Sequence, residues 1–119
     1  MEVNVGDIVL CKFYFSDFKA FKNRPVLVFK DNLPHDDFIG VPISSKVGKL
    51  YEDERIIDNQ QFSSGSLAVV SKLMIRKTFV ISKQSVIKKY ATLDVKFFDI
   101  YHIDFCKYFG CISCQDDQE

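Results

Sequence analysis

The stretch DIVLCKFYF, residues 7–15, carries a strong strand signal. In an extended chain its side chains alternate between two faces, and here both faces are largely apolar. A strand that is apolar on both sides has to be covered on both sides. We therefore predict that residues 7–15 form a central strand, or a strand at a packed corner of a barrel.

Further β-rich runs follow at residues 25–29 and 38–43, which we expect to form consecutive antiparallel strands. The residues between them favour a turn: Asp31, Asn32, Pro34, His35 and Asp36. Residues 44–65 are mostly polar, with one apolar piece at 55–58, and predict a long loop broken by a small strand. β character resumes at residues 66–70 and 73–81.

A helix is predicted near the end of the chain, where Asp94 can cap its start and Gly110 can end it in the left-handed conformation. Its apolar residues recur at steps of three and four: Val95, Phe98, Tyr101, Phe105, Tyr108 and Phe109. Ile100 and Ile103 fall on the opposite side, which favours contact with a partner there. Short strands followed by one helix predict a mainly β (α+β) fold, a small antiparallel barrel or rolled sheet.

The chain has 119 residues, a length that fits one domain over residues 1–119, with an acidic, frayed tail at 115–119. Its net charge is +0, from 16 basic and 16 acidic residues, which argues against a protein that coats nucleic acid by bulk attraction. No acidic residue occurs between Asp58 and Asp94, while six basic residues do: Lys72, Arg76, Lys77, Lys83, Lys88 and Lys89. Most of these fit a solvated face, and a phosphate-facing patch is open for a few.

The four cysteines, Cys11, Cys106, Cys111 and Cys114, lack the spacing of a secreted disulfide scaffold. We interpret them as reduced thiols in a cytoplasmic protein. The single CxxC at 111–114 would need two more ligands to hold zinc, and we expect no metal and no cofactor. The chain shows neither an export signal nor an apolar run long enough to span a membrane, and we expect neither.

Common enzyme signatures are absent: there is no phosphate-binding glycine loop, GxSxG, HExxH or dinucleotide-binding fingerprint. The two histidines, His35 and His102, could in principle form an acid-base pair for RNA cleavage. We favour a turn histidine and a helix-surface histidine instead.

Four segments follow one another in register: residues 6–10 (GDIVL), 13–17 (FYFSD), 23–28 (NRPVLV) and 41–45 (VPISS). Together they resemble the MazF/PemK family of toxin endoribonucleases, whose pattern is a Gly-Asp first strand, an Arg-Pro pair opening an apolar strand, and a Val-Pro-x-Ser/Thr turn. Ser71, the run 73–81 and the helix at 93–110 are similar to the PemK-like branch. The resemblance covers nearly the whole chain.

The resemblance implies an SH3-like small antiparallel β-barrel with short helices and a C-terminal helix, usually a homodimer, that a cognate antitoxin holds inactive. It also implies metal-independent cleavage of single-stranded RNA, in which the substrate's 2'-hydroxyl attacks the adjacent phosphate. Arg24 matches the family's catalytic arginine and Ser44 its hydroxyl residue. A guanidinium can bind two phosphate oxygens in the transition state while a hydroxyl fixes one of them. The alternatives are a surface arginine bonded to loop carbonyls and a turn serine.

The loop at 16–23 departs from the family pattern because it lacks the polar set that supplies a general base; Asp17 is a conjectural substitute. Ser71 and Met74 stand where relatives often carry an acidic and a basic residue, and Arg76 could supply the missing positive charge. We expect RNA in a groove between the loops 16–23 and 45–65, contacting Asp17, Lys19, Phe21, Lys22, Ser45, Lys46 and Arg76, with Phe18, Tyr51, Phe62 and Lys49 as further candidates. The alternative function is a catalytically silent SH3-like module that binds a protein or nucleic acid.

Overall fold

A computed structural model describes residues 2–14 and 21–111 of the chain. The strands are β1 (Asp7–Tyr14), β2 (Phe21–Leu33), β3 (Asp37–Ser44), β4 (Glu54–Ile57), β5 (Phe62–Gly65), β6 (Ser71–Met74), β7 (Phe79–Ser82) and β8 (Val86–Leu93). Short 3-10 helices lie at η1 (Pro34–Asp36), η2 (Asn59–Gln61), η3 (Ile75–Lys77) and η4 (Lys83–Ser85), and one α-helix, α1 (Val95–Phe109), follows the last strand. No helix within the described residues is long and apolar enough to cross a membrane.

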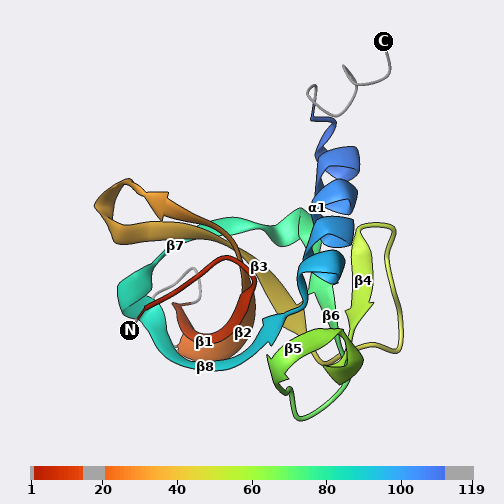
Figure 1. The fold of residues 1–119 in the computed structure, drawn as a ribbon, viewed down its shortest axis with the longest axis horizontal. Coiled ribbons are helices and arrows are strands. Elements are labelled where there is room, and N and C mark those ends of the chain that lie inside the picture. The colour runs from red at the N-terminus through yellow and green to blue at the C-terminus, as the bar shows by residue number, and fades with distance from the viewer. Residues whose placement is uncertain (1, 15–20, 112–119) are drawn as a thin grey trace.

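The strands form one antiparallel sheet in the order β4-β6-β3-β2-β1-β8-β5, and β7 pairs with the first half of β3. Figure 1 shows this sheet curling into a half-barrel, with α1 standing beside β3, β4 and β6. The prediction of a small, mainly antiparallel barrel with a C-terminal helix is confirmed. β1 lies between β2 and β8, as expected for residues 7–14, while residue 15 lies outside the described part of the chain.

Two hydrophobic clusters cover the two faces of β1. Ile8 belongs to a cluster with Leu27 and Val41 that packs against the buried Tyr101 of α1. Val9, which points to the opposite face, belongs to a second cluster with side chains from β2, β3, β7 and β8. Burying each such side chain stabilises the fold by about 1.5–3 kcal/mol, so the double coverage fixes the position of β1 and of the strand paired with it.

The helix α1 begins and ends where the sequence predicts. The Asp94 side chain accepts a hydrogen bond from the backbone N–H of Lys96, and Gly110 is left-handed with φ 68°. The predicted apolar face is confirmed for Phe98, Tyr101 and Phe105.

Three residues assigned to that apolar face, Val95, Tyr108 and Phe109, are exposed instead. Val95 lies in the first turn of α1, and Figure 1 shows the last turns of the helix extending past the strands, so no sheet covers Tyr108 and Phe109. Ile100 and Ile103 are exposed as expected, about half of each side chain being accessible. A partner on that side of the helix stays a prediction.

The strand predictions hold for β1, β3 and β4 and for the centre of β2, but β2 also includes residues 21–23, which were predicted as part of a loop, and Asp31 and Asn32, which were predicted as turn residues. The predictions fail in three further places downstream. Residues 66–70 form a loop, not a strand, and β5 precedes them within the predicted loop. The predicted run 73–81 is interrupted by η3, because Asp53 accepts the backbone N–H of Arg76 and holds a 3-10 turn there. The strand β8, which pairs with β1, was not predicted.

Candidate functional site

A surface hollow of about 460 Å³ opens where β2 begins and β3 ends. The strands are antiparallel, and their pairing at this end stops at Val26 opposite Pro42, so the start of β2 and the end of β3, which carry Arg24 and Ser44, lie at the same end of the pair. The lining residues come from β2, from β3 and the loop after it, from the loop before β6, and from β6, η3 and β8: Lys22, Asn23, Arg24, Pro25, Ile43, Ser44, Ser45, Lys46, Leu67, Ala68, Val69, Ser71, Lys77 and Tyr90. The two residues predicted to be catalytic therefore line one hollow. We call it the serine hollow.

Arg24 is held by a strand and not by a mobile loop. Its backbone pairs with Cys11 of β1, and the next residue, Pro25, pairs with Leu10. The side chain is partly buried, and among the described residues no hydrogen bond or ion pair holds the guanidinium. The guanidinium is thus available to bind an anion in the hollow.

The Ser44 hydroxyl accepts a hydrogen bond within a turn and keeps its own hydrogen available for donation. Its hydroxyl oxygen accepts the backbone N–H of Lys46 at 3.1 Å, which is the turn chemistry that serine favours. The hydroxyl proton can still be donated to a ligand oxygen. Ser45 and Lys46 follow directly and also line the serine hollow.

The charge of the hollow is one-sided. Its lining includes four cationic side chains, Lys22, Arg24, Lys46 and Lys77, and no carboxylate from the described residues. Lys77 was not predicted as a site residue, although it lies in the interval without acidic residues, which was the available signal. Converging positive charge without a carboxylate is suited to phosphate.

A second hollow of about 420 Å³ adjoins the first. It shares Lys22, Arg24 and Lys77 with the serine hollow, and the rest of its lining is apolar: Phe13, Pro42, Met74 and Phe79. The three shared cations therefore lie between a hollow lined by three serines and a tyrosine and a hollow whose other lining residues are apolar. We call the second one the phenylalanine hollow.

Arg76, which was predicted to contact the substrate, lines neither hollow. It was expected on a strand with Met74, but β6 ends at Met74 and η3 begins at the next residue. Its guanidinium lies 3.1 Å from the buried carboxylate of Asp53 and over the ring of Tyr51. Arg76 braces the turn, and Lys77 reaches the hollows instead.

The remaining predicted contacts separate into three groups. Asp17 and Lys19, with Phe18, lie outside the described residues, as does the side chain of Phe21. Tyr51 lines neither hollow and lies beneath the ammonium of Lys49 at 4.9 Å. Phe62 packs against the hydrophobic core, which is a structural role.

A buried ion network fixes the segment that follows Ser44. Lys72 of β6 lies 2.8 Å from Glu54 and also donates to the backbone carbonyl of Lys49. Burial alone would raise the pKa of Glu54, but hydrogen bonds from Lys72 and from the backbone of Tyr51 outweigh it and lower that pKa. The network ties residues 49–54 to β6, beside Ser71 in the serine hollow.

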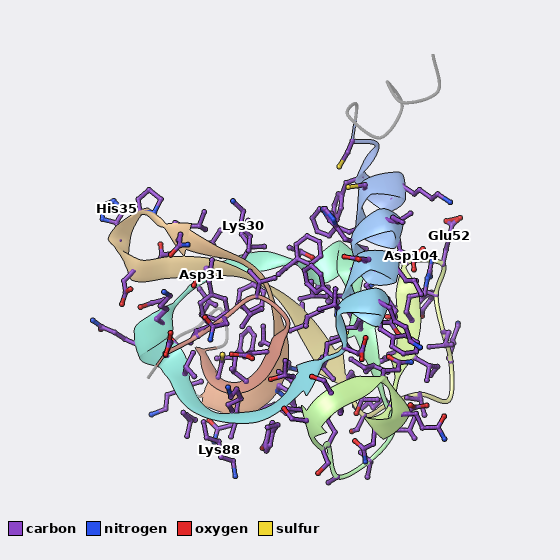
Figure 2. All side chains as sticks on the ribbon, viewed as in Figure 1. Lys30, Asp31, His35, Glu52, Lys88 and Asp104 are labelled. Atoms are coloured by element: carbon purple, nitrogen blue, oxygen red, sulfur yellow. The ribbon has the colours of Figure 1, made fainter. Side chains whose placement is uncertain are left out.

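Neither histidine lies at this site. His35 is at the tip of the β2–β3 hairpin, as Figure 2 shows, with a positive φ of 64°. His102 is exposed on α1, with its ring 5.4 Å from that of Phe29. Figure 2 also shows Asp104 on the side of α1 near β4, where it pairs with Arg55 at 3.1 Å.

None of the described cysteines lines either hollow. Cys11 is fully buried in the core, and burial raises the pKa of its thiol to about 12. Cys106 is buried on α1, Cys111 follows the helix, and Cys114 lies outside the described residues. Within the part of the chain that the structure describes, no group of three or more His, Cys, Asp or Glu side chains could hold a metal ion.

The fold and site together define a small SH3-like β-barrel protein with a cation-lined hollow at the facing ends of two strands. The family of PemK-like, MazF-like toxins of type II toxin-antitoxin systems matches residues 4–109, and the chain belongs to this family. The solved structure of the Mycobacterium tuberculosis toxin MazF-mt6 has a similar fold, with a TM-score of 0.63 and 18% identity over 86% of this chain and 96% of that one. No curated protein sequence matches the chain.

Proposed function

We propose that this toxin is an endoribonuclease that cleaves single-stranded RNA and that a cognate antitoxin neutralises it. The observation that carries the proposal is that Arg24 and Ser44 line one hollow, whose charged lining residues, among those that the structure describes, are all cationic. The family supports a toxin with an antitoxin partner and an RNA substrate. We also propose that the protein is a cytoplasmic homodimer, as members of the family usually are.

In the proposed reaction the 2'-hydroxyl oxygen of one nucleotide bonds to the adjacent phosphorus. The bond from phosphorus to the 5'-oxygen of the next nucleotide breaks, so the products are a 2',3'-cyclic phosphate and a 5'-hydroxyl. The attacking hydroxyl loses a proton and the leaving oxygen gains one. Arg24 stabilises the charge that develops on the phosphate oxygens, and Ser44 donates a hydrogen bond to one of them. Because the nucleophile belongs to the substrate, the reaction needs no metal-bound water.

The test is incubation of the purified protein with single-stranded RNA in EDTA, comparing wild type with Arg24→Ala. We expect cleavage to fall about 100- to 1000-fold, since one transition-state donor is lost. Lys107→Ala is the matched control, because Lys107 is an exposed cation on α1 that lines neither hollow. Circular dichroism should show that both variants are folded. A 2'-deoxy nucleotide at the cleaved position should abolish the reaction.

A catalytically silent binding module is the second candidate. The observation that favours it is the lack of a carboxylate among the described residues of the serine hollow, where a general base would be expected. In that case wild type would bind the RNA without cutting it, and Arg24→Ala would weaken binding alone.

A further inference from the structure

The phenylalanine hollow is an apolar surface that the proposed chemistry does not use. The rings of Phe13 and Phe79 lie with their centroids 4.8 Å apart at an angle of 44°. Both rings pack against the buried cluster that includes Val9, Val26 and Phe38, so their inner sides are fixed by the core. Met74 and Pro42, both buried, complete the apolar lining. The hollow is therefore held open by well-packed strands before any ligand arrives.

The polar lining of this hollow indicates what kind of molecule enters it. Among the residues that the structure describes, its charged groups are Lys22, Arg24 and Lys77, which also line the serine hollow. An anion bound by these cations would lie between the two hollows. If that anion is part of a polymer, the ligand groups on its two sides can each enter one of the hollows. A phosphodiester with a flat base on each side has this form, and apolar aromatic surfaces bind bases by stacking.

The two hollows differ in how they can recognise a base. The serine hollow presents Asn23, Ser44 and Ser45, whose side chains can form directed hydrogen bonds with base edges. The phenylalanine hollow presents, among described residues, no neutral side chain that donates or accepts strong hydrogen bonds. It can therefore bind a base by stacking, but it lacks the hydrogen-bonding groups that would distinguish one base from another.

We propose that the phenylalanine hollow binds the nucleobase on one side of the cleaved phosphate by stacking, and that it requires a base there while accepting any of the four. This inference rests on the proposed function for the position of the phosphate. Phe79 then supplies a stacking surface that accepts any base, whereas the hydrogen-bonding side chains of the serine hollow can favour particular bases.

The experiment uses short RNA oligonucleotides with an abasic nucleotide on either side of the cleaved linkage. For wild type, kcat/KM should fall about 10- to 100-fold for an abasic nucleotide at one of the two positions, the range that loss of one stacked base gives. The four natural bases at that position should differ by less than about threefold, which is less than one stacking contact contributes.

Phe79→Leu keeps the apolar volume but removes the ring, so it should cut base-containing and abasic oligonucleotides equally at that position. Phe79→Tyr keeps a ring and should behave as wild type. Phe97→Leu, on α1 and outside both hollows, is the matched control. The inference is overturned if wild type cleaves both abasic oligonucleotides like the parent, or if Phe79→Leu keeps the full dependence.

A binding measurement separates this inference from the proposed function. Anisotropy of a labelled oligonucleotide with a 2'-deoxy nucleotide at the cleaved position reports binding without cleavage. If wild type cleaves no RNA, the proposed function fails, while an abasic penalty on binding that Phe79→Leu removes would still support the hollow as a base site. If Phe79→Leu instead converts dimers to monomers in light scattering and no abasic penalty exists, the hollow is an interface between copies and the inference is wrong.

Discussion

Removal of the Lys72 ammonium should destabilise this protein far more than removal of an exposed lysine. Lys72→Met keeps most of the side-chain volume but leaves the Glu54 carboxylate without its cation. The side chains of this pair are only 9% and 3% exposed, and their charged atoms lie 2.8 Å apart. The Lys49 carbonyl also loses a hydrogen bond, of length 3.0 Å.

The expected cost lies between two limits. Breaking a deeply buried pair costs about 3–5 kcal/mol, and an exposed pair contributes about 0–1 kcal/mol. Here the pair is shielded from solvent only in part, because Tyr51, whose ring lies against the Lys72 ammonium, is itself half exposed. We therefore expect Lys72→Met to cost about 2–3 kcal/mol. With an m-value of about 1.5 kcal/mol/M, the urea midpoint should fall by about 1.3–2 M.

The assay is urea unfolding followed by circular dichroism, with Lys89→Met as the control. Lys89 is 46% exposed and lies 3.7 Å from Asp7, so its loss should cost less than about 1 kcal/mol. The double variant Glu54→Gln/Lys72→Met should recover part of the loss, because no unpaired charge remains buried. Equal midpoints for Lys72→Met and Lys89→Met would refute the reasoning.

The pH dependence of this difference follows from Glu54. Its pKa is lowered from 4.5 in the folded protein, so its stabilisation is complete above that ordinary value and is lost as the pH falls through the lowered one. Wild type and Lys72→Met should therefore converge in stability in acid. A gap that widens below pH 4.5 would contradict this sign.

Three further predictions concern single positions. Gly65→Ala should lower the free energy of unfolding by at least about 2 kcal/mol, because Gly65 has a φ of 75° and an added Cβ would meet the Tyr90 carbonyl and lie 2.6 Å from the Ala91 Cα. Gly48→Ala, which has open space around it, should be near neutral in the same urea assay. Cys11, whose pKa is raised to about 12 by burial, should resist thiol reagents at pH 8 until urea unfolds the chain, so that Cys11→Ser lowers the thiol count only in urea. The hydrogen bond from Lys83 lowers the pKa of Asp31 below its ordinary 3.8, so the stability it supplies is present above pH 3.8 and lost below it; Asp31→Asn should flatten the acid side of the melting-temperature profile, and an unchanged slope would count against the pair.

The parts of the fold predicted from sequence are those with local signals. The two apolar faces of residues 7–14 required a central strand, and Asp94 and Gly110 marked the ends of α1. β8 was missed because Lys88 and Lys89 interrupt its apolar pattern, although its end at Leu93 is buried. The turn at η3 depends on Asp53, which is distant in sequence, so no local pattern could reveal it.

The site was predicted in part, for the same reason. Arg24 and Ser44 belong to motifs that a single sequence shows, and an antiparallel hairpin brings the start of one strand beside the end of the next. Lys77 was missed and Arg76 chosen, because strand alternation was assumed across a 3-10 turn. The loop 66–70, predicted as a strand, lines the serine hollow with Ala68 and Val69, and its place depends on the Leu67 contact with the core.

The anchoring of Arg24 on a strand paired to β1 has an evolutionary consequence. Arg24 is held by the framework of the sheet, whereas part of the serine hollow, residues 45–46 and 67–69, belongs to segments that connect strands. On the proposed function, substitutions in those segments can change which RNA is bound without moving the guanidinium that stabilises the cleaved phosphate.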